Sequence, residues 1–302
     1  MTELDSPPLP RTPPHVRSIT IDAGDVDLSG LIAVPDRRPA RALIVAIHGA
    51  GMRAGYFDGR AHPDVSLLSL GAHHGFVVAA IDRPGYGISA SSLPHGQSLI
   101  DQATALAAAL NDLTARFDSG AGILLHAHSF GAKLALVTAA HHRRDDLLGV
   151  DISGCGHRYA QLLEPLTDLR HLRARNWGPL TSYPPGTFES ARALVAPVPF
   201  REIHEISSWE RVFPAVAQQI SVPVRFTFAE HEPWWRHDPK TLADLCDHLP
   251  NSPFVAIDHQ RGAGHNVSLG YSARTYHLRS LAFAEECMYL MSARNAAESR
   301  RG

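Results

Sequence analysis

A serine lies on a candidate strand-to-helix turn in the segment Ala127-His128-Ser129-Phe130-Gly131. The apolar run Ile123-Leu124-Leu125 precedes this segment, and helix-forming residues follow it from Ala132 to Val137. Such a turn needs small residues two positions before and two positions after the serine, because the backbone doubles back closely and strains the serine. The hydroxyl is then exposed beside a helix N-terminus, where it is suited to nucleophilic attack. Alanine stands at the first small position here, and helix capping is the alternative role for Ser129.

A nucleophilic serine needs a base within hydrogen-bond reach. His265 is the candidate, in Gly262-Ala263-Gly264-His265-Asn266 after the strand-like run Phe254 to Ile257. The two glycines predict a pliable loop at the carboxyl edge of the sheet. An imidazole with an ordinary pKa of ~6.5 takes the serine proton and returns it to a leaving group near neutral pH. The alternative for a lone histidine is a structural hydrogen bond.

The base in turn needs a carboxylate that orients it. Glu230 and Glu232 follow the predicted strand 222–228, and Asp238 comes a few residues later. Asp151 is a weaker candidate because it lies before the end of the predicted strand 147–153.

Strand-like and helix-like segments alternate around these residues. We expect apolar strands at 42–47, 76–82, 122–128, 147–153, 222–228 and 253–258, and helices at 64–74, 98–117, 130–142, 239–249 and 271–293. Continuously apolar strands are buried on both faces, which predicts an α/β fold with a mostly parallel central sheet and helices on both faces. The alternating segments 16–21 and 28–34 predict an antiparallel hairpin before this sheet.

The alternation stops between residues 155 and 219, a stretch rich in tryptophan, tyrosine, phenylalanine and proline. About 65 residues without a sheet of their own are too many for a plain loop. We therefore predict a helical cap (lid) at 155–219, inserted after the sixth strand between core segments 16–154 and 220–294. Residues 1–15 contain five prolines and predict a disordered N-terminal tail.

Composition bounds the possible partners of this 302-residue, 32.8-kDa chain, whose size suits one α/β domain with an insertion. A net charge of −2 argues against nucleic acid or an anionic membrane surface, and no apolar run is long enough to span a membrane. The N-terminus lacks the apolar core of a signal peptide. Three unevenly spaced cysteines suggest reduced thiols and a cytoplasmic location. No His-Glu-x-x-His or Gly-x-Gly-x-x-Gly pattern occurs, so we expect neither a metal nor a nicotinamide cofactor.

Two more turns complete a recognisable set. His48-Gly49-Ala50-Gly51 follows the strand 42–47, and Asp82-Arg83-Pro84-Gly85-Tyr86-Gly87 follows the strand 76–82. Together with the serine turn and the Gly-x-Gly-His segment, in this chain order, they resemble the α/β-hydrolase superfamily from about Val16 to Met291. The resemblance implies a catalytic Ser129–His265–Glu232 triad, since Glu232 matches the acid of the family's Gly-x-x-Asp-Pro turn. It also implies that the backbone N–H of Ala50 joins that of Phe130 in an oxyanion hole.

The set predicts a serine hydrolase that cleaves an ester, thioester or lactone of a medium-sized, largely apolar small molecule. The same triad would also serve a C–C bond hydrolase or an acyltransferase, and a ligand-binding receptor on this fold is the non-enzymatic alternative. We expect Trp177, Tyr183, Trp234 and His128 to contact the substrate, although His128 is expected to point away from the direction of Ser129. His48 is expected to brace neighbouring loops.

Overall fold

The computed structural model describes residues 16–36, 39–59, 61–160 and 175–299. The predicted tail 1–15 lies outside the described residues, and so does segment 161–174 of the predicted cap.

Eight strands form one sheet in the order β1-β2-β4-β3-β5-β6-β7-β8. The pairs β1–β2 and β2–β4 are antiparallel, and every other neighbouring pair is parallel. The four central strands are buried along their whole length. The predicted fold class and the opening hairpin are therefore confirmed. The strands are β1 (Arg17–Asp22), β2 (Asp27–Ala33), β3 (Leu43–Ile47), β4 (Val77–Ile81), β5 (Ile123–His128), β6 (Leu147–Ser153), β7 (Val224–His231) and β8 (Val255–Gly264).

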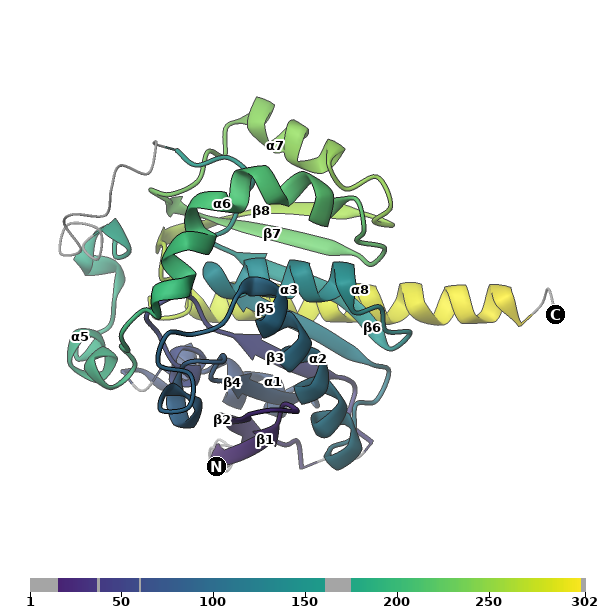
Figure 1. Cartoon of the computed structure of the whole chain (residues 1–302), viewed down its shortest axis with the longest axis horizontal. Coiled ribbons are helices and arrows are strands. Elements are labelled where there is room, and N and C mark those ends of the chain that lie inside the picture. The colour runs from purple at the N-terminus through teal and green to yellow at the C-terminus, as the bar shows by residue number, and fades with distance from the viewer. Residues whose placement is uncertain (1–15, 37–38, 60, 161–174, 300–302) are drawn as a thin grey trace, which may run out of the picture.

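Helices cover both faces of this sheet (Figure 1). One apolar cluster joins the sheet to α2 (Leu99–Arg116), α3 (Phe130–His141) and α7 (Pro239–Asp247), and a second joins it to α1 (Leu67–His73) and α8 (Ala273–Glu298). The side chain of Ser98 caps α2, and its Leu99–Leu113 stripe is buried, as the spacing of its leucines predicts. Because β4 and β5 lie on opposite sides of β3, the order in which successive strands are added to the sheet reverses at β3. The carboxyl ends of β3 and β5 thus flank a switch point, where α/β sheets place their ligands.

Strands β7 and β8 are longer than the sequence predicts. Glu230 and His231 belong to β7 and Gly262 to Gly264 belong to β8, where we expected loops. The two strands continue to pair beyond the carboxyl end of β6, because each satisfies the other's backbone N–H and C=O groups. A register shift after Ala229 and the left-handed φ of 66° at Gly262 absorb the irregularity. The glycines therefore shape a strand end and do not form the pliable loop that we expected.

The described part of 155–219 contains short helical turns, α5 (Thr187–Ser190) and the long helix α6 (Phe200–Ala217), and none of the sheet's strands. Trp209 and Phe213 of α6 are buried in the same apolar cluster as α3. α6 thus lies over the helix that begins at the candidate nucleophile (Figure 1).

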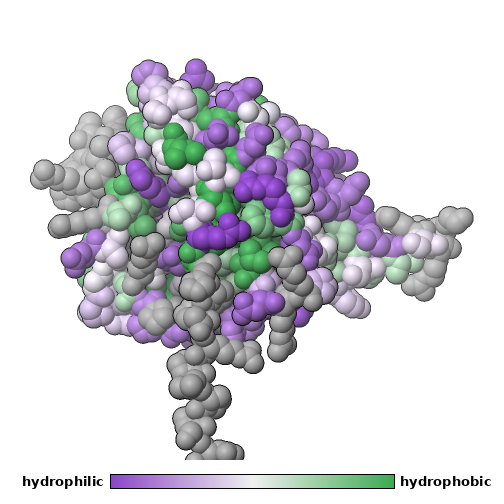
Figure 2. Space-filling view, turned by 90° about the horizontal axis from the view of Figure 1, so that it is seen from below, coloured by the Kyte–Doolittle hydropathy of each residue, from purple (hydrophilic) through white to green (hydrophobic). Residues whose placement is uncertain are grey.

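No helix in the described ranges is both long enough and apolar enough to cross a bilayer. Figure 2 shows the side of the molecule on which β1 and β2 lie, where hydrophobic residues gather near the middle and hydrophilic residues surround them.

Candidate active site

Ser129 sits on a strained turn between β5 and α3. Its φ of 55° and ψ of −117° make it the one non-glycine residue with positive φ among those described. Gly131 allows this turn because a Cβ there would lie 2.4 Å from the carbonyl oxygen of Ile47 and 2.5 Å from that of His48. Alanine suffices at position 127, which lies within β5 between Ile47 and Ile152 of the neighbouring strands. Ser129 Oγ caps no helix N–H, so the capping alternative fails.

The paired ends of β7 and β8 bring the predicted base and acid together. His231 pairs with Gly264 across the two strands, so the next residues, Glu232 and His265, leave the pair side by side. His265 Nδ1 lies 3.0 and 2.9 Å from the two Glu232 carboxylate oxygens, and His265 Nε2 lies 3.0 Å from Ser129 Oγ. Since a carboxylate only accepts, Nδ1 carries the imidazole proton and Nε2 is free to accept from the serine. The Trp234 N–H donates to Glu232 Oε1 at 3.0 Å and holds the carboxylate in place.

The three rival carboxylates have other partners. Glu230 accepts from the Gly262 N–H at 2.7 Å, and Asp238 caps α7 by accepting from Thr241. Asp151 is buried in β6, where it pairs with Arg225 at 2.8 Å and with His126 at 2.9 Å. Burial alone would raise the pKa of Asp151, but the charge of Arg225 and the hydrogen bond with His126 hold it below its ordinary value.

Gly154 leaves room for the imidazole of His265, a role that sequence reasoning missed. It follows β6 with a left-handed φ of 58°, and a Cβ there would lie 2.7 Å from His265 Cε1 and 2.8 Å from His128 Cε1. The two imidazoles lie 4.8 Å apart. The Ser-Gly pair at the end of a predicted strand was the available signal.

The loop after β3 lies against Ser129. Gly49 approaches so closely that a Cβ on it would be 3.0 Å from the Cβ of Ser129. The Arg83 N–H donates to His48 Nε2 at 3.1 Å, so His48 Nδ1 carries the proton and donates to the Gly49 carbonyl at 2.7 Å. His48 thus joins this loop to the Asp82–Gly87 loop, and burial together with the charge of Arg83 lowers its pKa. Next in the chain, Ala50 reaches the cavity beside Ser129.

Arg83 ties the same loop to α6. It donates to the carbonyls of His48 and Gly49 at 2.8 and 3.3 Å. Its other N–H groups donate to Glu202 at 2.5 and 3.1 Å, and both side chains of this pair are fully buried. The Tyr86 hydroxyl also donates to Glu202, at 2.8 Å. One buried ion pair therefore fixes the predicted cap helix and the loop that carries Ala50.

A cavity of about 140 Å³ opens beside the serine. Ser129, His265, Ala50 and Phe130 line it, and the N–H of Phe130 has no acceptor within α3 because Phe130 is the first residue of that helix. The remaining wall is mostly aromatic or apolar. It consists of Tyr159, Ile206, Trp234 and Trp235 together with Asn176 and Lys133.

Of the predicted substrate contacts, Trp234 lines this cavity, and Trp177, Tyr183 and His128 lie away from it. Trp177 and Tyr183 pack against Phe188 and behind Gly264, where a Cβ would meet the Trp177 carbonyl oxygen at 2.3 Å. His128 is buried and stacks on Tyr56 with its Nδ1 3.0 Å from the Ser153 hydroxyl. In the described structure these three rings pack against the end of β8 and against His265, and their contact with the substrate stays a prediction.

Sequence reasoning missed most of the cavity wall. Lys133 had a usable signal, since a residue four positions after Ser129 on a helix lies on the same face. Tyr159, Asn176 and Ile206 come from the irregular insertion, where spacing alone does not specify which side chains face inward.

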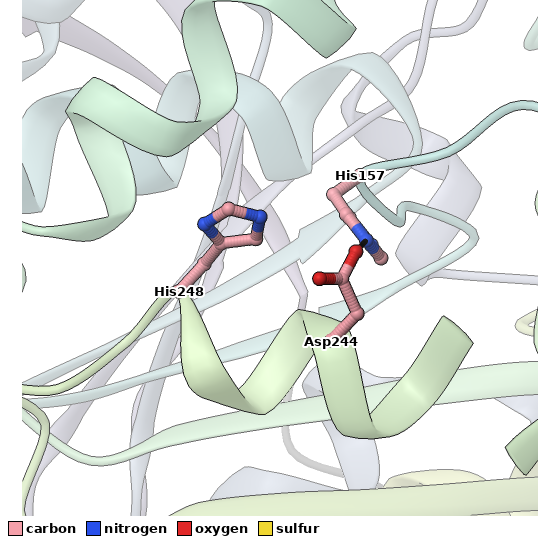
Figure 3. A group of neighbouring side chains, drawn as sticks. All are labelled: His157, Asp244 and His248. Carbon is pink, nitrogen blue, oxygen red and sulfur yellow. Dashed lines mark hydrogen bonds and ion pairs between the residues drawn. The ribbon is translucent and has the colours of Figure 1, made fainter. Parts of the chain in front are cut away.

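Three side chains outside the cavity form a group with metal-ligand chemistry (Figure 3). His157 Nε2 lies 2.8 Å from Asp244 Oδ2, and the His248 ring lies 5.5 Å from that of His157. Two imidazoles and a carboxylate suit Zn²⁺. Arg158 Nη2, however, lies 3.7 Å from the same carboxylate oxygen and supplies the positive charge that a metal would bring. We treat the group as an ion-pair cluster, and its sequence signal was Asp244-x-x-x-His248, one helical turn apart.

A larger cavity of about 550 Å³ lies between β1, β2 and the segments around Arg53 and Ser190. None of the three candidate triad residues lines it.

Comparison with known proteins agrees with this geometry. The model of the alpha/beta hydrolase family matches residues 44–278, and the chain belongs to that family. No curated protein sequence matches. Similar solved structures include a carboxyl esterase from Bacillus coagulans (17% identity, TM-score 0.67, covering 91% of this chain and 98% of that one). Others are a monoglyceride lipase from Saccharomyces cerevisiae (15%, 0.64, 91% and 95%) and a proline iminopeptidase from Mycobacterium smegmatis (15%, 0.60, 91% and 99%). At these identities the likeness establishes the fold and leaves the substrate to be argued from the site.

Proposed function

We propose that this protein is a serine hydrolase that cleaves an ester, thioester or lactone bond of a small molecule through an acyl-serine intermediate. The observation that carries the proposal is the continuous hydrogen-bonded chain from Ser129 Oγ through His265 to Glu232, with Ser129 on a strained turn that faces a cavity. Nucleophile, base and orienting acid are the three parts that acyl transfer requires.

The proposed reaction assigns one group to each step. His265 Nε2 takes the proton of Ser129 as Oγ attacks the substrate carbonyl, and Glu232 stabilises the imidazolium that forms. The N–H groups of Ala50 and Phe130 donate to the oxyanion that develops. His265 then gives its proton to the leaving group, which departs and leaves an acyl-serine. A water molecule, activated by His265 in the same way, releases the acid.

The cavity wall supports the proposed substrate class. Trp234, Trp235, Tyr159 and Ile206 offer mainly apolar surface beside Ser129, and burial of apolar substrate groups against it contributes about 25 cal/mol per Å². The volume of about 140 Å³ is below the ~300–1,000 Å³ of typical ligand pockets, which favours a compact acyl or alcohol group of medium size. We therefore favour a small molecule over a peptide or polysaccharide chain.

Turnover of p-nitrophenyl esters from acetate to decanoate tests the proposal. We expect kcat/KM to rise beyond acetate until the cavity is filled and then to fall. Ser129→Ala should remove up to ~6 decades of rate while its thermal unfolding stays unchanged. Ser98→Ala, which removes the cap of α2, is a matched serine control that should retain the rate. Full activity in Ser129→Ala, or no turnover of any ester by the wild type, would overturn the proposal.

A further inference from the structure

Lys133 is a buried ammonium in the wall of the catalytic cavity. It lies one helical turn after Ser129 on α3, lines the same cavity and is 3% exposed. The chain uses arginine at nearly every basic position, and its other lysine is Lys240 on the exposed side of α7.

The surroundings of Lys133 hold it in place without neutralising it. Nζ donates to the Tyr159 hydroxyl oxygen at 2.7 Å, and that hydroxyl donates its own proton to the Ile206 carbonyl at 2.8 Å. Four aromatic rings lie 5.4–5.7 Å from Nζ, namely those of Phe130, Tyr159, Trp209 and Trp235. Ring faces attract a cation, but they accept no proton from it. Two of the three ammonium N–H groups therefore have no acceptor among the described residues.

Among the described residues, Glu202 and Glu205 are the carboxylates whose charge acts on Lys133, and both have other partners. Glu202 pairs with Arg83, and Glu205 accepts from the Leu99 N–H at 3.2 Å. Within the described ranges no carboxylate forms an ion pair with Lys133. Burial lowers the pKa of Lys133 to about 8, which still leaves the group mostly protonated at neutral pH.

An unpaired buried charge destabilises a fold, and an apolar residue of similar length would pack there without that penalty. The charge is instead presented to the space that the substrate enters. We propose that Lys133 binds a carboxylate carried by the substrate, so that the substrate is an ester or thioester with an aromatic or aliphatic body and one anionic end. This inference rests on the proposed function and narrows its substrate class.

Helix geometry sets the reach. Four residues of α-helix advance about 6 Å along the axis, so Lys133 is suited to an anion a few carbons from the scissile carbonyl. The carboxylate belongs either to the acyl group or to the leaving alcohol, and the two sources call for different probes.

The first probes are p-nitrophenyl hemi-esters of succinic, glutaric and adipic acid, each compared with the uncharged p-nitrophenyl ester of the same carbon number. A fourth pair, for the alcohol side, is the butyryl ester of 4-hydroxybenzoate against that of 4-methylphenol. We expect the wild type to prefer the anionic member of at least one pair by roughly 10- to 100-fold in kcat/KM, as for a hydrogen bond to a charged group. Lys133→Met should reduce that ratio to about one, and Lys240→Met should leave it unchanged.

Binding gives a readout that needs no turnover. In the Ser129→Ala background, ligand binding can be followed by the intrinsic tryptophan fluorescence, to which Trp234 and Trp235 of the cavity wall contribute. It should report tighter binding of the anionic hemi-ester than of its neutral partner. Adding Lys133→Met should abolish this difference, and circular dichroism verifies that the variant is folded. If Lys133→Met does not fold, the kcat/KM ratio of anionic to neutral esters in the wild type still tests whether the cavity binds an anion.

Two results would overturn the inference. The first is the absence of an anion preference in all four wild-type pairs. The second is an unchanged ratio in Lys133→Met, including one that results from an equal loss on charged and neutral esters. In each case turnover of neutral esters leaves the proposed function intact. Failure of every ester to react while the anion preference persists in binding would instead refute the hydrolase and keep the anion site.

Discussion

The acid of the candidate triad is a glutamate whose two oxygens both lie within 3.0 Å of His265 Nδ1. Glu232→Gln keeps the shape but replaces an acceptor with an amide, so the imidazole loses both its orientation and the charge that stabilises its protonated form. We expect kcat to fall by up to ~10⁴-fold. Glu230→Gln and Asp238→Asn are matched controls with small effects, measured in the same ester assay. A crippling effect of Asp238→Asn would contradict the assignment.

The oxyanion hole is a prediction about backbone N–H groups. Ala50→Pro deletes one donor, and removal of one such donor lowers kcat by about 10²–10³-fold. Ala50→Ser keeps the N–H and adds one hydroxyl, so it should cost far less. The two variants should be compared by steady-state kinetics on one neutral ester. Equal activities would count against Ala50 as a donor.

Residues next to a diagnostic turn were predictable from the sequence, and residues that act through a distant partner were not. Ser129 and His265 were chosen because each lies near the end of a predicted strand, and Glu232 was chosen because it matches the acid of the family's Gly-x-x-Asp-Pro turn. Lys133 needed the structure because its meaning depends on Tyr159 and Trp235, which reach it from other parts of the chain. Trp177 and Tyr183 were predicted to contact the substrate from aromatic composition alone, which does not reveal which way a ring points.

At the scale of elements, the end of β6 controls the space for His265. Gly154→Ala would force a Cβ to within 2.7 Å of His265 Cε1 and would also strain the left-handed backbone. We expect a loss of kcat of at least tenfold with a modest fall in the unfolding temperature, because the imidazole must shift from Ser129.

Gly186→Ala is the matched control for this variant. It has a similar positive φ of 83°, and a Cβ there meets nothing within 4 Å. It should therefore show the backbone strain alone, measured by thermal unfolding, and retain the rate. A Gly154→Ala enzyme as active as the wild type would show that His265 has more freedom than its packing indicates.

Element types and order follow from the sequence, and the ends of β7 and β8 do not. Apolar periodicity predicts where a strand is buried, but His231 and Gly264 extend the pair beyond the core and have no apolar signature. That extension is nevertheless what sets Glu232 beside His265. The insertion 155–219 lacks periodicity. Its sequence therefore predicted helices but not the residues at which α5 and α6 begin and end.

For the whole molecule, the buried ion pair of Asp151 and Arg225 links β6 to β7. Asp151→Asn would leave the Arg225 guanidinium buried without its main partner, and we expect the free energy of unfolding to fall by about 3–5 kcal/mol. Asp258→Asn removes a more exposed contact at 3.3 Å from Arg225 and should change it by about 1 kcal/mol or less. Urea unfolding at pH 7 measures both.

The same pair predicts a pH dependence. Because the folded pKa of Asp151 is held below its ordinary value, its contribution is present above the unfolded pKa of ~3.9 and is lost as the pH falls below it. The difference in the free energy of unfolding between wild type and Asp151→Asn should therefore become smaller from pH 5 to pH 3. Urea unfolding at intervals of about one pH unit measures this change. A difference that stays constant over this interval would exclude the ion pair as its source.

The molecule as a whole is proposed to work through one acylated residue, and a fluorophosphonate probe tests this claim most directly. The probe reacts with serines that have been activated as nucleophiles. Intact mass spectrometry followed by peptide mapping should show a single adduct, on Ser129 of the wild type, which is absent in Ser129→Ala and slowed in Glu232→Gln. An adduct on another residue, or none on a folded wild-type protein, would contradict the account.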